Sequence, residues 1–89
     1  MEEYEYTAGG RRLTKHAARR LAERPVGVDE VIDNFSHRFV QDDGAQVFVK
    51  RQSTNRYAVV VVDDGGVVTV LASVTKHELR NLARNYGWR

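Results

Sequence analysis

The second half of the chain most constrains its fold, because apolar and polar residues alternate there in four short segments separated by turns. These segments have the length and period of strands and are His37–Gln41, Gln46–Arg51, Tyr57–Val62 and Val67–Ala72. Asp43-Gly44 and Asp64-Gly65 fall between neighbouring segments, and such pairs are typical of tight hairpins. Connections this short leave no room for a crossover helix, so the pattern predicts a four-stranded antiparallel meander.

Residues with helical spacing precede and follow this meander. A first apolar stripe repeats every four residues, at Leu13, Ala17 and Leu21. Thr14 caps the start of that helix and Pro25 ends it, and a shorter helix is predicted from Asp29 through Asn34. A last helix, which starts at Ser73 or Thr75, has one apolar face: Leu79, Leu82, Ala83 and Tyr86. We therefore predict an α+β fold with two N-terminal helices, a four-stranded antiparallel meander and a C-terminal helix.

Length and composition indicate one small domain. The chain has 89 residues, of which 42% are hydrophobic, so residues 1–89 are interpreted as a single unit whose residues 1–10 form a linker or an edge strand. The sequence contains no cysteine, which excludes disulfides, thiolate metal sites and a cysteine nucleophile. No apolar run approaches the roughly 20 residues of a membrane span.

The net charge is +2, and basic side chains concentrate in residues 11–24, which predicts a local basic patch.

Parity along the predicted strands divides the sheet into two faces. One face collects six valines that form a core: Val47, Val49, Val59, Val61, Val68 and Val70. The opposite face is mixed: Gln46, Phe48, Lys50, Val60, Thr69 and Leu71. A functional site is expected on this mixed face, because it displays a lysine and a threonine among apolar residues. A slip of one residue would exchange the two faces of a strand.

Four side chains are the candidates for catalysis. His16 and Arg20 lie four residues apart on one border of the first helix's apolar stripe. An imidazole accepts and returns a proton near neutral pH, and a guanidinium holds a phosphate through paired hydrogen bonds. Lys50 and Thr69 are predicted to face each other across the mixed face of the sheet. The alternative for each of the four is a solvated or strand-forming residue without a chemical role.

Other residues are candidates for binding rather than chemistry. Arg19, Arg51 and Arg56 would attract an anion, and Tyr57 would stack on a base, with surface charge and core packing as the alternatives. The acidic pairs Asp42-Asp43 and Asp63-Asp64 are explained by turn chemistry. The sequence has no HExxH motif, glycine-rich nucleotide loop or clustered carboxylates, so it predicts no cofactor and no metal.

Several short motifs, taken in their order along the chain, resemble a family of small bacterial domains. The motifs are Leu13-Thr14-Lys15-His16-Ala17, Arg20, Glu23-Arg24, Val28–Ile32, Val68-Thr69-Val70, the segment Thr75–Ala83 and Tyr86-Gly87-Trp88. The family is grouped with the barnase, EndoU, colicin and RelE ribonucleases. It includes toxin domains at the C-termini of large secreted or contact-dependent polymorphic toxins. The resemblance covers residues 13–88.

The resemblance implies a metal-independent ribonuclease that cleaves RNA, with tRNA as one candidate, through attack by the RNA's own 2′-OH and histidine general acid–base catalysis. His16 matches the family's helix histidine and Thr69 its late-strand threonine, while Arg20 and Lys50 match basic positions. A cognate immunity or antitoxin protein is implied as a partner. So are secretion as part of a larger toxin and action in the cytoplasm of a target cell.

Two alternatives stay open at this point. One is a RelE-like mRNA interferase of a toxin–antitoxin pair, and the other is a non-catalytic module that binds RNA or protein. An enzyme would degrade RNA in EDTA, whereas a binding module would only retain RNA, with an affinity that falls as salt rises.

Overall fold

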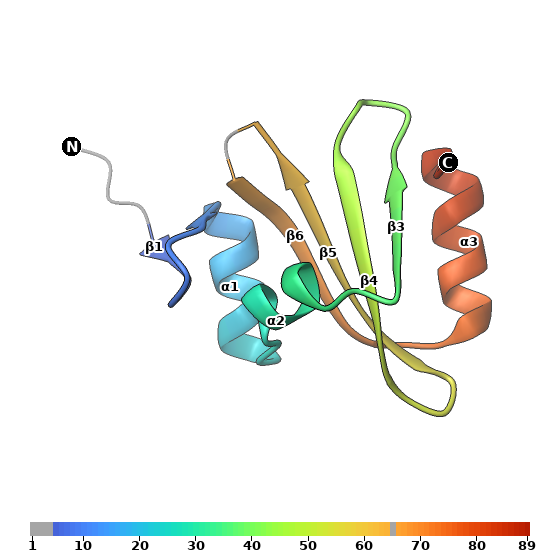
Figure 1. Cartoon of the computed structure of the whole chain (residues 1–89), viewed down its shortest axis with the longest axis horizontal. Coiled ribbons are helices and arrows are strands. Elements are labelled where there is room, and N and C mark those ends of the chain that lie inside the picture. The colour runs from blue at the N-terminus through green and yellow to red at the C-terminus, as the bar shows by residue number, and fades with distance from the viewer. Residues whose placement is uncertain (1–4, 65) are drawn as a thin grey trace.

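A six-stranded mixed sheet with helices on both faces forms the fold, as the computed structural model of residues 5–64 and 66–89 shows (Figure 1). The elements in chain order are β1 (Glu5–Tyr6), β2 (Arg12–Leu13), α1 (Lys15–Glu23), α2 (Val28–Asp33), β3 (His37–Val40), β4 (Gln46–Ser53), β5 (Arg56–Asp63), β6 (Gly66–Val74) and α3 (Lys76–Tyr86). The spatial order of the strands is β1-β2-β6-β5-β4-β3. Residues 1–4 of the predicted linker or edge strand, and Gly65 of the second predicted turn, lie outside the described residues.

The prediction of a four-stranded antiparallel sheet behind two N-terminal helices is wrong. Two short strands precede the helices: β1 pairs antiparallel with β2, and β2 pairs parallel with β6 through Leu13 and Val67. This parallel pairing makes the sheet mixed. β1 lies within residues 1–10, for which a linker or an edge strand was expected, but a strand of two residues shows no alternation of apolar and polar side chains, so hydrophobic periodicity could not reveal β2.

Capping residues fix where the longer helices begin and end. The Thr14 hydroxyl accepts a hydrogen bond from the Ala17 N–H at 3.2 Å and so caps α1. Thr75 and Glu78 form a capping box at the start of α3. α3 ends at Gly87, whose φ of 63° lies in the left-handed region that glycine tolerates best. Local sequence signals therefore set where these two helices begin and where α3 ends.

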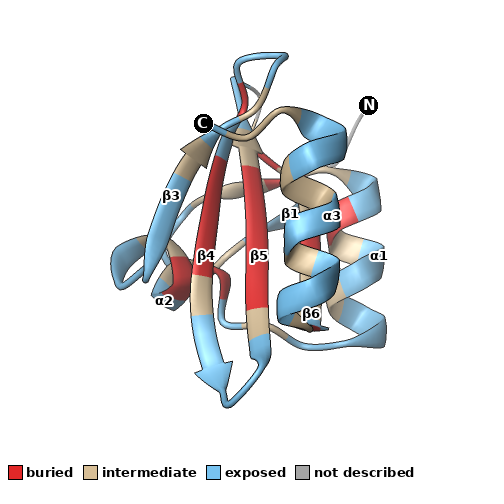
Figure 2. Cartoon of the chain, turned by 90° about the vertical axis from the view of Figure 1, so that its right-hand side faces the viewer, coloured by how far each residue is buried: buried red, intermediate tan, exposed pale blue. Residues whose placement is uncertain are grey.

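Both faces of the sheet are buried, rather than one. On the first face, α1 and α2 pack against one cluster: Leu13, Ala17, Val28, Val31, Phe48, Ala58, Val60, Val67 and Val70. On the second face lies another cluster, against which Leu79, Leu82 and Trp88 pack: Ala45, Val47, Val49, Val59, Val61 and Val74. Figure 2 shows the buried residues along the middle of β4 and β5, with α3 in front of the sheet.

A β-bulge in β6 decides which of its residues share a face. Val62 pairs with Val67, but the next pair joins Val61 to Thr69, so Val68 is an extra residue in β6. The extra residue inverts the parity of the later residues in this strand. Val70 therefore lies in the core under α1, and Thr69 lies on the α3 side beside Val61. The predicted faces are consequently wrong for the strand residues beyond the bulge.

The segment before β2 is attached to α2 through Asp29. The Thr7 hydroxyl and Arg11 Nη1 both donate to Asp29 Oδ1, at 2.8 and 2.7 Å, and the Gly9 N–H donates to Oδ2 at 2.7 Å. These hydrogen bonds, that from Thr7 above all, hold the pKa of Asp29 below its usual value. The N-terminal hairpin is thereby fixed to the helix layer.

Candidate functional site

A groove between α1 and α3 gathers polar side chains over the α3 side of β5 and β6, and we call it the α1–α3 groove. Its volume is about 460 Å³, which lies within the usual range for sites that bind small ligands. α1 contributes His16 and Arg20. The floor consists of Val59, Val61, Val68, Thr69 and Leu71, and the opposite wall consists of Gln41, Asp43, Leu82, Tyr86 and Trp88.

The first turn of α1 is fastened to β6, and this contact places His16 at the groove. The Thr14 N–H donates to the Val67 carbonyl at 3.0 Å, and the Thr14 hydroxyl donates to the Val68 carbonyl at 3.4 Å. His16 lies two residues later, and Arg20 lies one helical turn beyond it on the same side of α1. Both side chains are exposed to solvent.

Thr69 reaches the same groove because of the bulge at Val68. Without the extra residue, Thr69 would follow the parity that places it on the α1 and α2 side of the sheet. With it, Thr69 lies beside Val61 on the groove floor. Within residues 5–64 and 66–89, no hydrogen bond or ion pair occupies the side chains of His16, Arg20 and Thr69, so all three are available to a ligand.

The wall opposite α1 is built where the end of α3 joins the β3–β4 hairpin. Trp88 Nε1 donates to Gln41 Oε1 at 3.1 Å, and the Trp88 ring stacks on Phe39 with centroids 5.4 Å apart. The Asp42 N–H donates to the Tyr86 carbonyl at 3.0 Å. These contacts hold an amide, a carboxylate and two aromatic rings on one side of the groove: Gln41, Asp43, Tyr86 and Trp88.

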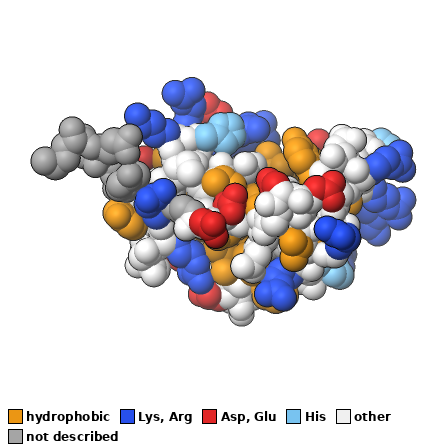
Figure 3. Space-filling model, turned by 90° about the horizontal axis from the view of Figure 1, so that it is seen from above, with side chains coloured by type: hydrophobic (Ala, Val, Ile, Leu, Met, Phe, Trp, Pro, Cys, Tyr) orange, Lys and Arg blue, Asp and Glu red, His pale blue; other side chains and the backbone are white. Residues whose placement is uncertain are grey.

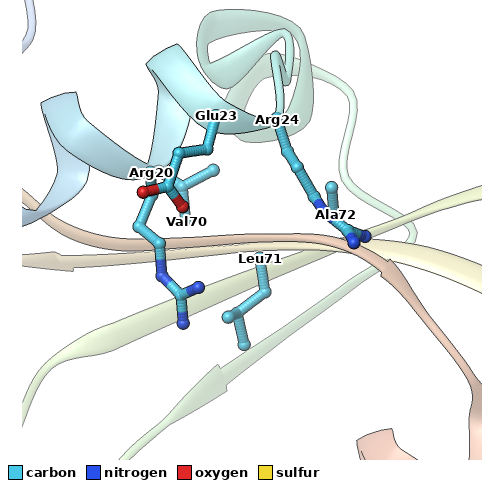
Figure 4. Close-up of a pocket in the computed structure, with 6 residues that line it drawn as sticks. All are labelled: Arg20, Glu23, Arg24, Val70, Leu71 and Ala72. Atoms are coloured by element: carbon cyan, nitrogen blue, oxygen red, sulfur yellow. The ribbon is translucent and has the colours of Figure 1, made fainter.

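A second hollow of about 290 Å³ continues from the groove along α1. The two hollows share Arg20 and Leu71. Figure 4 shows the side chains of Arg20 and Glu23 on α1, and of Arg24 just after its end, extending toward β6, with Arg20 beside Leu71. Arg20 therefore stands at the junction, where its guanidinium is within reach of a ligand in either hollow.

Lys50 does not join this group, contrary to the prediction that it faces Thr69. It pairs with Ala58, which lies in the core beneath α1 and α2, and its Nζ donates to the Asn34 carbonyl at 3.4 Å. Lys50 and Thr69 are thus on opposite faces of the sheet. The physical reason is the bulge, which moves Thr69 and leaves Lys50 where parity placed it.

The four residues predicted to bind RNA do not line the α1–α3 groove. Arg19 is exposed on α1 beside Arg20. Arg51 and Arg56 lie at the β4–β5 hairpin, where their side chains donate to the Ser53 and Asn55 carbonyls. Tyr57 packs against the core under α3. A role for these residues in RNA binding stays a prediction.

Charge around the groove is uneven. Acidic residues lie in or next to the turns that connect β3 to β4 and β5 to β6: Asp42, Asp43, Asp63 and Asp64. Figure 3 looks onto the end of the sheet where these turns lie, and it shows acidic side chains near the middle with basic side chains on both sides. Positive charge at the groove therefore comes from α1, while Asp43 makes the opposite wall negative.

The sequence predicted three of the groove residues for chemical reasons and missed most of the opposite wall. Asp43 was explained by the turn, and its side chain does accept the Ala45 N–H at 2.9 Å. Nothing in the sequence indicates that this turn residue also borders a groove. Tyr86 was expected on the apolar face of its helix, yet it is 52% exposed. Its place at the end of α3, just before Gly87, was the available signal.

Metal centres and membrane spans are the remaining classes of site. The described ranges, 5–64 and 66–89, contain no group of three or more His, Asp and Glu side chains arranged to hold a metal ion. The same ranges contain no helix with the length and apolar character needed to cross a membrane.

Comparison with known proteins adds no relative. No family model, curated protein or solved structure matches this chain. The resemblance to ribonuclease toxin domains, with its immunity protein and its secretion, therefore stays a prediction from short motifs.

Proposed function

We propose that this protein is a ribonuclease that cleaves RNA in the α1–α3 groove without a metal ion. The observation that carries the proposal is the convergence of His16, Arg20 and Thr69, from two different elements, on one groove of about 460 Å³. These side chains supply a proton carrier, a fixed positive charge and a hydroxyl donor, which cleavage of a phosphodiester by an internal nucleophile requires.

The reaction uses the 2′-OH of RNA as the nucleophile. The 2′ oxygen forms a bond to the adjacent phosphorus, and the bond from phosphorus to the 5′ oxygen of the next nucleotide breaks. The imidazole of His16 takes the 2′ proton and returns it to the departing 5′ oxygen, so no proton is lost or gained. The products are a 2′,3′-cyclic phosphate and a free 5′-OH. DNA lacks the 2′-OH and is not a substrate.

The other two side chains act on the charge that develops at phosphorus. Arg20 binds the non-bridging oxygens through its guanidinium, which presents paired N–H donors to a phosphate. The Thr69 hydroxyl donates to a phosphate oxygen from the groove floor. Donors that are held in place before the reaction stabilise the transition state because they need no reorganisation.

The test is cleavage of a short labelled RNA by purified protein in EDTA. We expect His16→Ala to lower the rate by about 10²–10⁴-fold, the usual contribution of general acid–base catalysis. The matched control is His77→Ala, because His77 is an exposed histidine on α3 that does not line the groove. Products from wild type should end in a cyclic phosphate. Intact RNA after incubation with folded wild-type protein, or equal rates for both variants, would refute the proposal.

A further inference from the structure

The side chains of the wall opposite α1 include a carboxylate and aromatic rings, and these groups are not suited to binding a phosphate. A carboxylate there repels phosphate, so the phosphate of a bound nucleotide belongs at the end with His16 and Arg20. The groove has the volume of a site for one small ligand. A single nucleotide that places its phosphate at α1 must therefore extend its base toward Asp43 and Tyr86.

We propose that this wall is a purine subsite, with Asp43 as the residue that determines base specificity. The inference rests on the proposed ribonuclease function, because the base belongs to the nucleotide whose 2′-OH and 3′-phosphate lie near His16. It adds the identity of the base at which the RNA is cut.

Tyr86 supplies the surface on which the base stacks. Tyr86 is 52% exposed and borders the groove, whereas the neighbouring Trp88 is partly buried and its ring stacks on Phe39. Stacking on an aromatic ring favours the larger purines over pyrimidines and stabilises any base by a measurable amount. The hydrogen bond between the Asp42 N–H and the Tyr86 carbonyl fixes this part of α3 next to the turn that carries Asp43.

Asp43 supplies the acceptor. Its Oδ1 accepts from the Ala45 N–H at 2.9 Å and from Gln41 Nε2 at 3.3 Å, which fixes the orientation of the carboxylate. The same bonds, that from Ala45 above all, keep the pKa of Asp43 below its usual value. Its Oδ2 has no hydrogen-bond partner in the part of the chain that the structure describes.

An ionised carboxylate only accepts hydrogen bonds, and this property selects among the bases. Guanine and adenine present amino N–H groups on their Watson–Crick edges. Uracil presents two carbonyl oxygens beside its single N–H, and these oxygens face a carboxylate with like charge. Cytosine has an amino group but a smaller ring to stack. The wall therefore favours guanine and adenine, with cytosine weaker and uracil weakest.

The experiment uses four DNA oligonucleotides that each contain one ribonucleotide, either G, A, C or U, at the same position. Only the ribonucleotide carries a 2′-OH, so cleavage reports on its base. Wild type should cleave the G and A substrates about tenfold or more faster than the U substrate, which corresponds to the stacking and hydrogen-bond contributions expected of such a subsite. Asp43→Asn should remove most of this preference, because its amide can both accept from a purine amino group and donate to the uracil oxygens, so the rates on the G, A and U substrates should approach one another.

Asp43→Asn keeps an amide oxygen that can accept the Ala45 N–H, so the turn is preserved. Asp42→Asn is the matched control, because it removes the same charge from the same turn at a residue that does not line the groove. Equal cleavage of all four substrates by wild type, or an unchanged preference in Asp43→Asn, would overturn the subsite while leaving the ribonuclease intact.

Binding of 3′-nucleotides separates the two proposals if none of the substrates is cut. Tighter binding of 3′-GMP than of 3′-UMP, with the difference lost in Asp43→Asn, would support the subsite although the proposed reaction had failed. Equal binding of the two nucleotides, or binding of neither, would overturn the subsite as well.

Discussion

Two adjacent arginines on α1 differ in their surroundings. Arg20 borders both hollows beside β6, whereas Arg19 is exposed and lines neither of them. Successive helical residues point about 100° apart, so neighbours in sequence do not share a face. The sequence singles out Arg20 as a candidate for catalysis through its spacing of four residues from His16, whereas Arg19 is a candidate for RNA binding through its charge alone.

The two arginines make a matched pair of substitutions. Arg20→Ala should lower kcat/KM for RNA cleavage by about 10²-fold, because it removes a donor that stabilises charge in the transition state. Arg19→Ala should change kcat/KM by less than about threefold, since only long-range attraction is lost. Steady-state kinetics on a short RNA measures both. A larger loss for Arg19→Ala than for Arg20→Ala would place the phosphate outside the groove.

At the scale of elements, Thr14 at the start of α1 contributes both to the stability of the helix and to the position of the α1–α3 groove residues. Thr14 caps the helix and bonds to the Val67 and Val68 carbonyls, so it joins α1 to the bulge that positions Thr69. Thr75 also caps a helix, but it lies at the start of α3, whereas Tyr86 is at the end of that helix. The two caps therefore have similar structural roles and different distances from the groove.

Thr14→Ala should lower the free energy of unfolding by about 1 kcal/mol, the usual effect of losing a helix cap, and should also reduce RNA cleavage. Thr75→Ala should cost a similar amount of stability and leave cleavage close to wild type. Urea denaturation gives the stabilities, and cleavage is measured well below the unfolding midpoints. Parallel losses of activity in both variants would show that general stability, rather than the position of His16, controls the rate.

Local signals predict the longer elements well, and they fail where pairing is non-local. The Asp43-Gly44 turn, the caps at Thr14 and Thr75 and the stop at Gly87 all act through neighbouring residues, and a single sequence contains them. The bulge at Val68 depends on how β6 pairs with β5, and no glycine or other turn residue marks it. The wrong prediction that Lys50 and Thr69 share a face of the sheet follows from Val68, the extra residue of this bulge.

The site could be predicted in part for the same reason. His16 and Arg20 share a helix, and their spacing alone places them on one side. Thr69 was selected for its chemistry but assigned to the wrong face of the sheet. Asp43 and Tyr86 are 43 positions apart and meet only because α3 returns to the β3–β4 hairpin, a contact between distant segments that periodicity does not reveal.

For the whole molecule, the attachment of the N-terminal segment to α2 predicts a dependence of stability on pH. The pKa of Asp29 is lowered in the folded state, so the carboxylate stabilises the fold above its unfolded pKa, and this contribution is lost as the pH falls through the acid range. Asp29→Asn should therefore lower the free energy of unfolding at pH 7 by about 1 kcal/mol, allowing for partial exposure, and should flatten the decline below pH 5.

Asp33→Asn is the control for that measurement. Among the described residues, the Asp33 side chain makes its one hydrogen bond and ion pair with Arg11 Nη2, at 3.2 Å, and it is 61% exposed, so a smaller effect is expected. Urea denaturation at pH values from 3 to 7 provides the curves. Identical curves for wild type and Asp29→Asn would show that the Asp29 contacts do not contribute to stability.

The place where RNA binds on the molecule decides whether the α1–α3 groove is the site of cleavage. The measurement is the change in backbone amide NMR shifts when an uncleavable 2′-deoxy oligonucleotide is added to the ¹⁵N-labelled protein. We expect the changes to gather around the α1–α3 groove, at His16, Arg20, Thr69 and Tyr86. Changes that gather instead around Lys50, Arg51 and Arg56, or no changes at all, would contradict this expectation.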